Sequence, residues 1–258
     1  MLRRLLSIML AQLLLVSVCA GGLGSERQKS DSEVKGLKGQ PQKVTYEWAT
    51  LTKTGEAVTE AERKISSIET YDPQGNLTQV ESYFQGSIHS RTHYFNLDGA
   101  RASKFEILSQ INGGGGIGVG GEQGKADPRF NTKYKYKYDK QGNRVEMTEI
   151  NNYGRKTGVT TYKYDAQGNL LESDETLYMY RVSPPEFKKK SVYQLNEKGE
   201  TIHLTQPTYT VDYSDYKYDE KGNWISRKMS SVATYYNKKY PHSQMEYRTI
   251  IYYTAPAK

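Results

Sequence analysis

The sequence predicts an all-β protein: an antiparallel meander of β-hairpin repeats that forms an open, curved sheet. Three observations support this prediction. A six-residue motif, Tyr-Asp-x-x-Gly-Asn, recurs along the chain, and the residues before it alternate between tyrosine and lysine. In addition, Tyr (23 residues) far outnumbers Phe (5) and the mean hydropathy is -0.80. This composition fits a sheet with a half-buried aromatic face better than a thick aliphatic core.

The motif has four intact copies, at 71–76, 138–143, 164–169 and 218–223, and degraded copies at 95–99 and 195–199. Asp can accept hydrogen bonds from backbone amides two or three residues on. Gly supplies the left-handed backbone angle that closes a short hairpin loop. Each copy therefore predicts a strand, a tight turn and a second strand. The residues given this structural turn role are Asp72, Gly75, Asn76, Asp139, Gly142, Asn143, Asp165, Gly168, Asn169, Asp219, Gly222 and Asn223.

The residues before the turns predict strands with two different faces. Tyr134, Tyr136 and Tyr138 alternate with lysines, and a two-residue period places all three rings on one face and the lysines on the other. The same alternation precedes the copies at 164 and 218. Stacked hairpins would align these tyrosines into cross-strand ladders. Because no hairpin can bury its face alone, we expect stability to depend on neighbouring repeats.

The first 20 residues have the pattern of a cleavable export signal. A positively charged start precedes an apolar run that is shorter than the ~20 residues of a membrane span. The sequence leaves two processing routes open. One is cleavage after Ala20, and the other is lipidation of Cys19, although the bulky Val18 precedes it. Since Cys19 is the only cysteine, we expect no disulfide framework.

The rest of the chain divides by composition. Residues 21–43 are rich in Gly, Ser, Lys, Glu and Gln and predict a flexible polar linker. Residues 44–258 form the predicted repeat-built sheet, with a mobile Gly-rich loop at 112–125. The formal net charge of +7 at pH 7 fits either a solvated lysine face or attraction to an acidic polymer.

The motif resembles that of the Rhs, or YD-repeat, family. The match is residue by residue in the four intact copies and partial around Gly99 and Gly199, so it covers about 70–222. The resemblance implies an exported or cell-surface bacterial protein, with an extended antiparallel sheet of hairpins that acts as a scaffold or recognition surface. It implies no shared catalytic residues. Large members wind the sheet into a shell around a toxin, but this chain is too short for a shell and lacks the core motif that precedes a toxin domain.

The sequence predicts no catalytic residues, no metal site and no cofactor. His89 and His93 lie on one face of a strand but about 13 Å apart, too far for one metal ion without a bend. The stretch 119–126 imitates a phosphate-binding loop, yet Ala126 stands where a magnesium-binding hydroxyl is required. The aspartates of the motif are already explained by their turns. Trp48 and Trp224 fit a packed core better than an exposed face that stacks on sugars.

We therefore expect a non-catalytic exported protein of the periplasm, outer envelope or cell surface that binds a glycan or a protein partner. Any membrane contact would be made through a lipid anchor at Cys19. Interleaved Tyr and Lys also imitate a nucleic-acid groove, but the export signal argues against nucleic acid as the natural partner. Two alternatives stay open. One is an exported hydrolase of an envelope polymer, which would need a pocket with converging catalytic groups. The other is a structural subunit that self-associates through its end strands.

Overall fold

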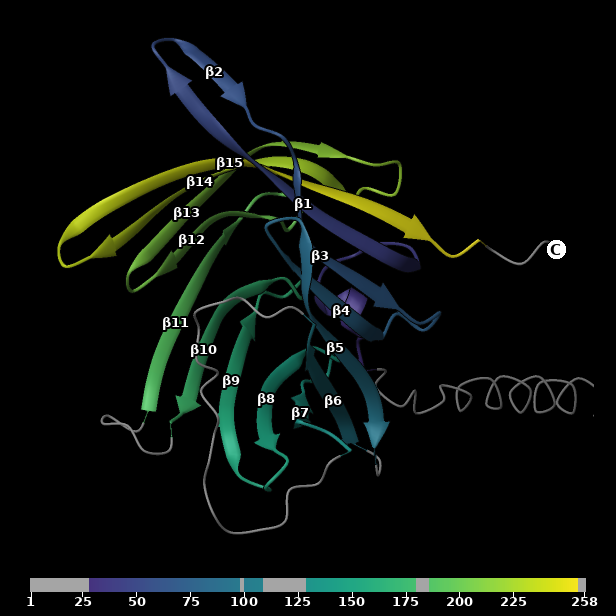
Figure 1. Cartoon of the computed structure of the whole chain (residues 1–258). Coiled ribbons are helices and arrows are strands. Elements are labelled where there is room, and N and C mark those ends of the chain that lie inside the picture. The colour runs from purple at the N-terminus through teal and green to yellow at the C-terminus, as the bar shows by residue number, and fades with distance from the viewer. Residues whose placement is uncertain (1–27, 98–99, 109–128, 180–185, 255–258) are drawn as a thin grey trace, which may run out of the picture.

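The computed structural model describes residues 28–97, 100–108, 129–179 and 186–254. Within these residues a short helix precedes fifteen strands of one antiparallel sheet (Figure 1). The elements are α2 (Asp31–Val34), β1 (Pro41–Thr54), β2 (Ala57–Glu60), β3 (Lys64–Tyr71), β4 (Leu77–Phe84), β5 (Ser87–Leu97), β6 (Ala100–Ile107), β7 (Thr132–Tyr138), β8 (Arg144–Asn151), β9 (Lys156–Tyr164), β10 (Leu170–Tyr178), β11 (Glu186–Leu195), β12 (Thr201–Gln206), β13 (Tyr209–Tyr218), β14 (Trp224–Tyr235) and β15 (Lys238–Tyr252).

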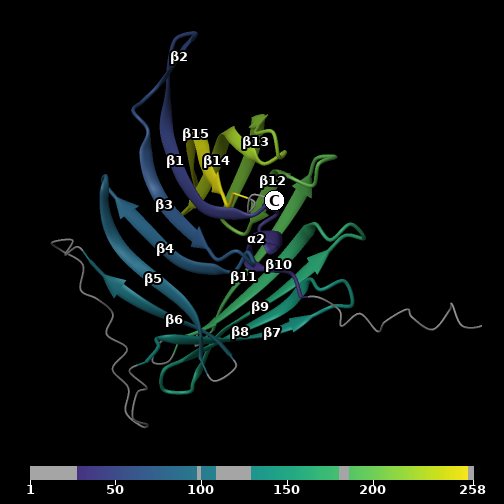
Figure 2. The same ribbon diagram turned by 90° about the vertical axis from the view of Figure 1, so that its right-hand side faces the viewer.

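The sheet closes into a barrel. Strands β3 to β15 follow one another as a meander, and β1 pairs with β3 on one side and with β15 on the other. Fourteen strands thus form the wall, while β2 only extends β1 as a hairpin. Figure 2 shows the strands on both sides of α2.

The sequence-based prediction of an open, curved sheet is wrong, because the sheet is closed. The antiparallel meander is present, but its end strands pair with each other, with Val44 opposite Ile250 and Tyr46 opposite Arg248. This pairing satisfies backbone groups that an open sheet would leave exposed. The pairing also engages both end strands, β1 and β15, with each other. A subunit that self-associates would have used these same strands to bind a second copy.

All the repeat turns lie at one end of the barrel. Successive strands are antiparallel, so connections separated by two strands fall at the same end. We call this the turn end; it carries the turns at 72–76, 139–143, 165–169, 196–200 and 219–223. The opposite end carries the other connections, including those at 85–86, 152–155 and 236–237. The degraded copy at 95–99 runs partly outside the described residues.

The turn at 72–76 shows the geometry shared by the intact copies. Asp72 Oδ1 accepts from the backbone amides of Gln74 (3.0 Å) and Asn76 (2.8 Å). Gly75 N donates to Asp72 O at 2.9 Å, and its φ of 84° lies in the left-handed region. The resulting type I turn with a bulge explains why the motif needs glycine at this position. The degraded copy at 196–200 forms the same turn, with Asn196 in place of aspartate.

The wall has an aromatic inner face and a charged outer face. Tyr134, Tyr136 and Tyr138 are half-buried, with consecutive ring centroids 6.3 and 6.2 Å apart. Between them, Lys135 and Lys137 are exposed. Outward side chains also pair across strands: Lys137 with Glu146 (3.0 Å), Lys163 with Glu172 (2.8 Å) and Lys190 with Glu172 (3.1 Å).

The fully buried apolar cluster lies at the turn end. It consists of Leu37, Val44, Tyr71 and Leu77. Leu37 belongs to the stretch for which we predicted a flexible linker, and that prediction is wrong for residues 28–43. Residues 28–40 are packed against the barrel, and β1 begins at Pro41. Two apolar residues, Val34 and Leu37, are too few to show a periodic pattern, yet Leu37 packs in a cluster with residues of distant strands.

Several predictions concern residues outside the described part of the chain. These are the export signal at 1–20, lipidation of Cys19, the linker at 21–27 and the Gly-rich loop at 112–125. Within the described residues, no helix is both long and apolar enough to cross a membrane.

Candidate functional site: the barrel interior at the turn end

Residues 28–40, here called the closing segment, cross the barrel at the turn end. Figure 2 shows α2, which belongs to this segment, with strands on either side. The segment is held by backbone carbonyls and one asparagine side chain of the repeat turns. Lys29 N donates to Gly142 O (3.1 Å), Ser32 N to Gly75 O (2.9 Å) and Lys38 N to Asn223 Oδ1 (2.8 Å).

The local fold of the segment starts from a capping box. Ser30 is the N-cap of α2, and its hydroxyl accepts from Glu33 N while the Glu33 carboxylate accepts from Ser30 N at 2.8 Å. These reciprocal bonds satisfy backbone donors that a short helix otherwise leaves unpaired. As a result, the intervening Asp31 points at the barrel wall.

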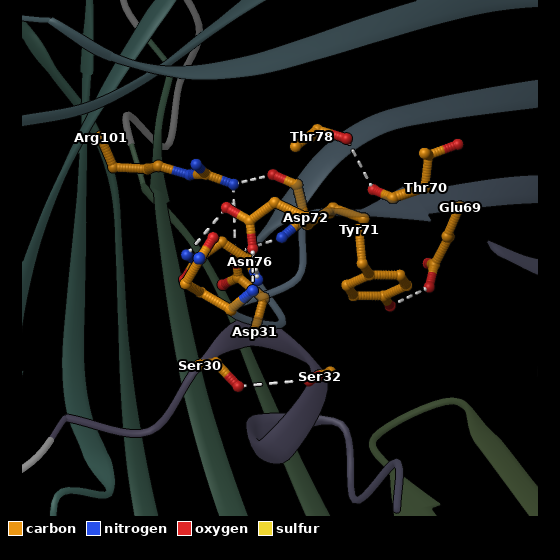
Figure 3. Close-up of polar contacts among 12 residues, drawn as sticks. Ser30, Asp31, Ser32, Glu69, Thr70, Tyr71, Asp72, Asn76, Thr78 and Arg101 are labelled. Atoms are coloured by element: carbon orange, nitrogen blue, oxygen red, sulfur yellow. Dashed lines mark hydrogen bonds and ion pairs between the residues drawn. The ribbon is translucent and has the colours of Figure 1, made fainter. Parts of the chain in front are cut away.

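Asp31 is clamped by two arginines of the wall. Its Oδ2 lies 3.1 Å from Arg101 Nη2 and its Oδ1 lies 3.0 Å from Arg144 Nη2. The carboxylate also accepts from Leu77 N at 3.0 Å. Figure 3 shows Asp31 and Arg101 beside the turn that starts at Asp72. The three charged side chains are only 13 to 17% exposed, so their mutual attraction is screened less than at the surface.

A second carboxylate, Glu69 on β3, is held by three donors. Lys35 Nζ of the closing segment lies 2.5 Å from Oε1, and Tyr71 OH lies 2.5 Å and Tyr46 OH 3.2 Å from Oε2. Figure 3 shows Tyr71 and Glu69 in this arrangement. Burial and the nearby Glu69 raise the pKa values of Tyr46 and Tyr71, so both phenols stay protonated donors.

A cavity of about 830 Å³ lies between the closing segment and the wall made by β1, β3 and the C-terminal strands. Trp224 lies at its wall with two arginines against its ring. The guanidinium carbon lies 3.6 Å from the ring centroid for Arg248 and 4.2 Å for Arg227. The indole thus orients two cations beside the same cavity.

The two arginines differ in their partners. Arg227 forms an ion pair with Glu246 at 2.7 Å. Arg248 is only 8% exposed and donates through Nε to Trp224 O at 2.8 Å. Among the described residues no carboxylate forms an ion pair with it. Burial accordingly lowers the pKa of Arg248.

The cavity has more cations than carboxylates. Lys29, Lys35, Lys38 and Lys198 line it together with Arg227 and Arg248, whereas the carboxylates are Glu33, Glu69 and Glu200. Those carboxylates already accept hydrogen bonds from neighbours. Glu200, for example, accepts from Tyr218 OH and, at 3.2 Å, from Asn196 Nδ2. This cavity is therefore lined by more positive than negative charge.

The structure separates the candidates singled out from the sequence. The repeat-turn residues gather at the turn end, where Asn223 Nδ2 also donates to Lys38 O at 3.0 Å. Trp224 lines the large cavity, whereas Trp48 does not and has Lys64 over its ring at 5.7 Å. No group of three His, Cys, Asp or Glu side chains suited to a metal occurs among the described residues.

Sequence reasoning missed the charged residues of the site. Arg101, Arg144 and Arg248 are isolated charges in separate strands, and no spacing links them. The single local signal is the Ser-x-x-Glu pattern at Ser30 and Glu33, which is typical of a helix start. It could have marked the closing segment as structured.

Of the comparisons with known proteins, the one with solved structures finds a likeness to this chain. No family model matches it, and no curated protein matches it. Among solved structures, the chain is similar to a porin-like protein from Bacteroides uniformis, with 11% sequence identity and a TM-score of 0.45 over 82% of this chain and 98% of that chain. A likeness this remote carries no inference about function.

The closed barrel also corrects the description of the chain as Rhs-like or as a YD-repeat protein. That resemblance implied an extended, open sheet, whereas β1 and β15 pair along their length. Hairpin turns of the Asp-x-x-Gly type need only a local backbone geometry, so unrelated folds can share them.

Proposed function

We propose that the protein is an exported, non-catalytic binding barrel of the cell envelope, and that its interior cavity takes an acidic glycan. The observation behind this proposal is the arrangement of Trp224, Arg227 and Arg248 beside a cavity of about 830 Å³. A buried guanidinium without a carboxylate partner favours an anionic ligand group, because charge-assisted hydrogen bonds would offset its desolvation.

The interior also suits a sugar. Tyr46 and Trp224 are the aromatic side chains that line this cavity. Tyrosines present both a ring and a hydroxyl, and a glycan offers matching apolar faces and hydroxyl groups. A cavity of this size lies within the range of small-molecule sites, which favours a glycan fragment over a folded protein partner.

Two further observations support a binding role in a watery compartment of the envelope. The carboxylates of the cavity are held by neighbouring donors, as Glu69 is by Lys35 and Tyr71, which favours binding over acid–base catalysis. The outer face carries ion pairs such as Lys190–Glu172, with Lys190 in the middle of β11. A lysine facing lipid near the bilayer centre would cost about 2–4 kcal/mol, so the outer face suits water.

Binding of a mixed panel of acidic and neutral oligosaccharides tests the proposal. We expect the purified protein to bind acidic members, such as an oligogalacturonate, and to bind them more weakly as salt is added. Arg248→Met, which keeps an apolar stem of similar length, should weaken binding at least about tenfold. The control is Lys135→Met on the exposed outer face, which should leave affinity unchanged. Failure of every acidic saccharide to bind would contradict the proposal.

A further inference from the structure

We propose that Arg101 and Arg144 form a carboxylate-binding site in the barrel wall, which Asp31 occupies from within the same chain. An acidic ligand that reaches the two arginines takes the place of Asp31 and loosens residues 28–33 of the closing segment. This site is separate from the cavity beside Trp224, and the proposal does not depend on what that cavity holds.

The wall holds the two arginines in place without Asp31. Arg144 packs on Tyr136, with 3.9 Å from its guanidinium carbon to the ring centroid, and Arg101 lies 5.3 Å from the Tyr94 centroid. Arg101 also donates to Leu77 O. Planar guanidinium groups fixed by stacking are well suited to bind carboxylates. The pair is therefore a preformed site and does not owe its geometry to the residue that fills it.

One carboxylate does not satisfy this pair. Two guanidinium groups share Asp31, and Arg144 Nε is buried with no hydrogen-bond partner among the described residues. A buried donor left unpaired costs free energy, which a ligand with more acceptor atoms would recover. Three other carboxylates line the cavities beside the pair: Glu69, Asp72 and Glu149. Glu69 and Asp72 already accept hydrogen bonds from other donors, and burial raises the pKa of Glu149, so none of them competes strongly for the arginines.

There is room for a ligand larger than the Asp31 side chain. A cavity of about 630 Å³ is lined by Asp31, Arg101 and Arg144, and another of about 350 Å³ borders the same three side chains. The larger one is also lined by Pro73 and Gln74, which are exposed. An acidic group can therefore approach the arginines from the surface at the turn end.

Displacement of Asp31 would act on the first half of the closing segment. Its carboxylate makes three of the contacts that fix this half: to Arg101, to Arg144 and to Leu77 N. The second half is anchored independently by the buried Leu37. We therefore expect residues 28–33 to loosen while the rest of the barrel stays folded.

The first experiment empties the site and refills it with acetate. Asp31→Ala should lower the melting temperature, and acetate should restore most of the loss, while chloride at equal ionic strength should not. The matched control is Glu33→Gln, which removes a carboxylate from the same segment but keeps a side chain that can accept the capping bonds; acetate should leave its melting temperature unchanged. Should Asp31→Ala fail to fold, Asp31→Ser takes its place, because its short polar side chain still leaves room for acetate. If acetate and chloride change the melting temperature of the Asp31 variant equally, the proposal of a carboxylate-binding site is wrong.

The second experiment asks whether an acidic ligand displaces Asp31 in the unaltered protein. Trypsin can cut after Lys29 only when this stretch is loose. We expect citrate to accelerate this cleavage at least about fivefold, in proportion to the population of the open form, and citramide, its uncharged triamide, to leave it unchanged. The same acceleration should be lost in Arg144→Gln. If citrate leaves cleavage unchanged although acetate rescues Asp31→Ala, then the proposal that a ligand displaces Asp31 is wrong.

Discussion

The two ends of the barrel are built from the same hairpins but differ in what covers them. At the turn end, Gly75 packs under Ser30 and Ser32 of the closing segment. At the opposite end, Asn151 and Gly154 form the same kind of turn, yet a side chain added at Gly154 would meet nothing within 4 Å. Turn geometry alone therefore does not create a packed end. The turn end is packed because the closing segment lies across its turns.

Some apolar side chains show the same difference, although Phe130 and Val211 are buried toward the opposite end. The buried cluster around Leu37 lies at the turn end, while inward-facing strand positions toward the other end, such as Phe105 and Ile107, are 46% and 63% exposed. The hairpin tip there has Tyr236 and Asn237 in the left-handed region, with φ of 48° and 62°. We expect the cluster around Leu37 at the turn end to contribute more to stability than exposed positions such as Phe105 and Ile107.

The largest expected contrast is between two apolar truncations. Leu37→Ala removes a buried side chain from the cluster and should lower the free energy of unfolding by about 2–5 kcal/mol. Ile107→Ala, at an exposed position, should change it by less than about 0.5 kcal/mol. Urea unfolding of both variants measures the difference. Similar losses at the two positions would mean that the ends are equally important for stability.

A smaller contrast is expected between two glycines with nearly the same backbone. Gly75 has a φ of 84° and Gly154 a φ of 77°, so Ala at either position should cost about 1–2 kcal/mol of backbone strain. A Cβ at Gly75 would also lie 2.8 Å from Ser30 Oγ and closer still to Ser32 Oγ. Gly75→Ala should therefore lose about 1–3 kcal/mol more than Gly154→Ala. Thermal unfolding of the two variants gives this difference directly, and equal losses would place the closing segment away from the turn.

The smallest expected contrast is in how the stability of turns at the two ends depends on pH. The Asn169 side chain and nearby backbone amides hold the pKa of Asp165 below its ordinary value. A lowered folded-state pKa contributes stability above the unfolded-state pKa, and this contribution is lost as pH falls through the folded-state pKa. At the opposite end Asn151 fills the same role with an uncharged amide.

Asp165→Asn should therefore give the turn at 165–169 the same uncharged first residue that Asn151 provides at the opposite end. The stability advantage of the unaltered protein over this variant should be present at pH 7 and should shrink below about pH 4. Urea unfolding of both proteins at pH 7, 5 and 3 measures this difference in the free energy of unfolding. An advantage of the same size at pH 3 would show that the carboxylate charge does not stabilise the turn.

How much the sequence could predict depends on the range of the interaction. The turn at 72–76 depends on contacts within five residues, and the faces of β7 depend on strict alternation, so both can be predicted from local pattern. Closure depends on the number, tilt and stagger of the strands together, which no single repeat contains. Arg101 and Arg144 become partners of Asp31 only because the barrel brings three distant segments to one point.

Formation of a disulfide between β1 and β15 tests the closed barrel most directly. Thr45 and Thr249 are direct partners in the closing pair of strands. With both replaced by Cys in a Cys19→Ser background, mild oxidation should give an intramolecular disulfide, since paired strand positions lie within bonding range. The control pairs Thr45→Cys with Thr161→Cys on β9, across the barrel, and should give none. The absence of an intramolecular disulfide between positions 45 and 249 would contradict closure and leave the sheet open.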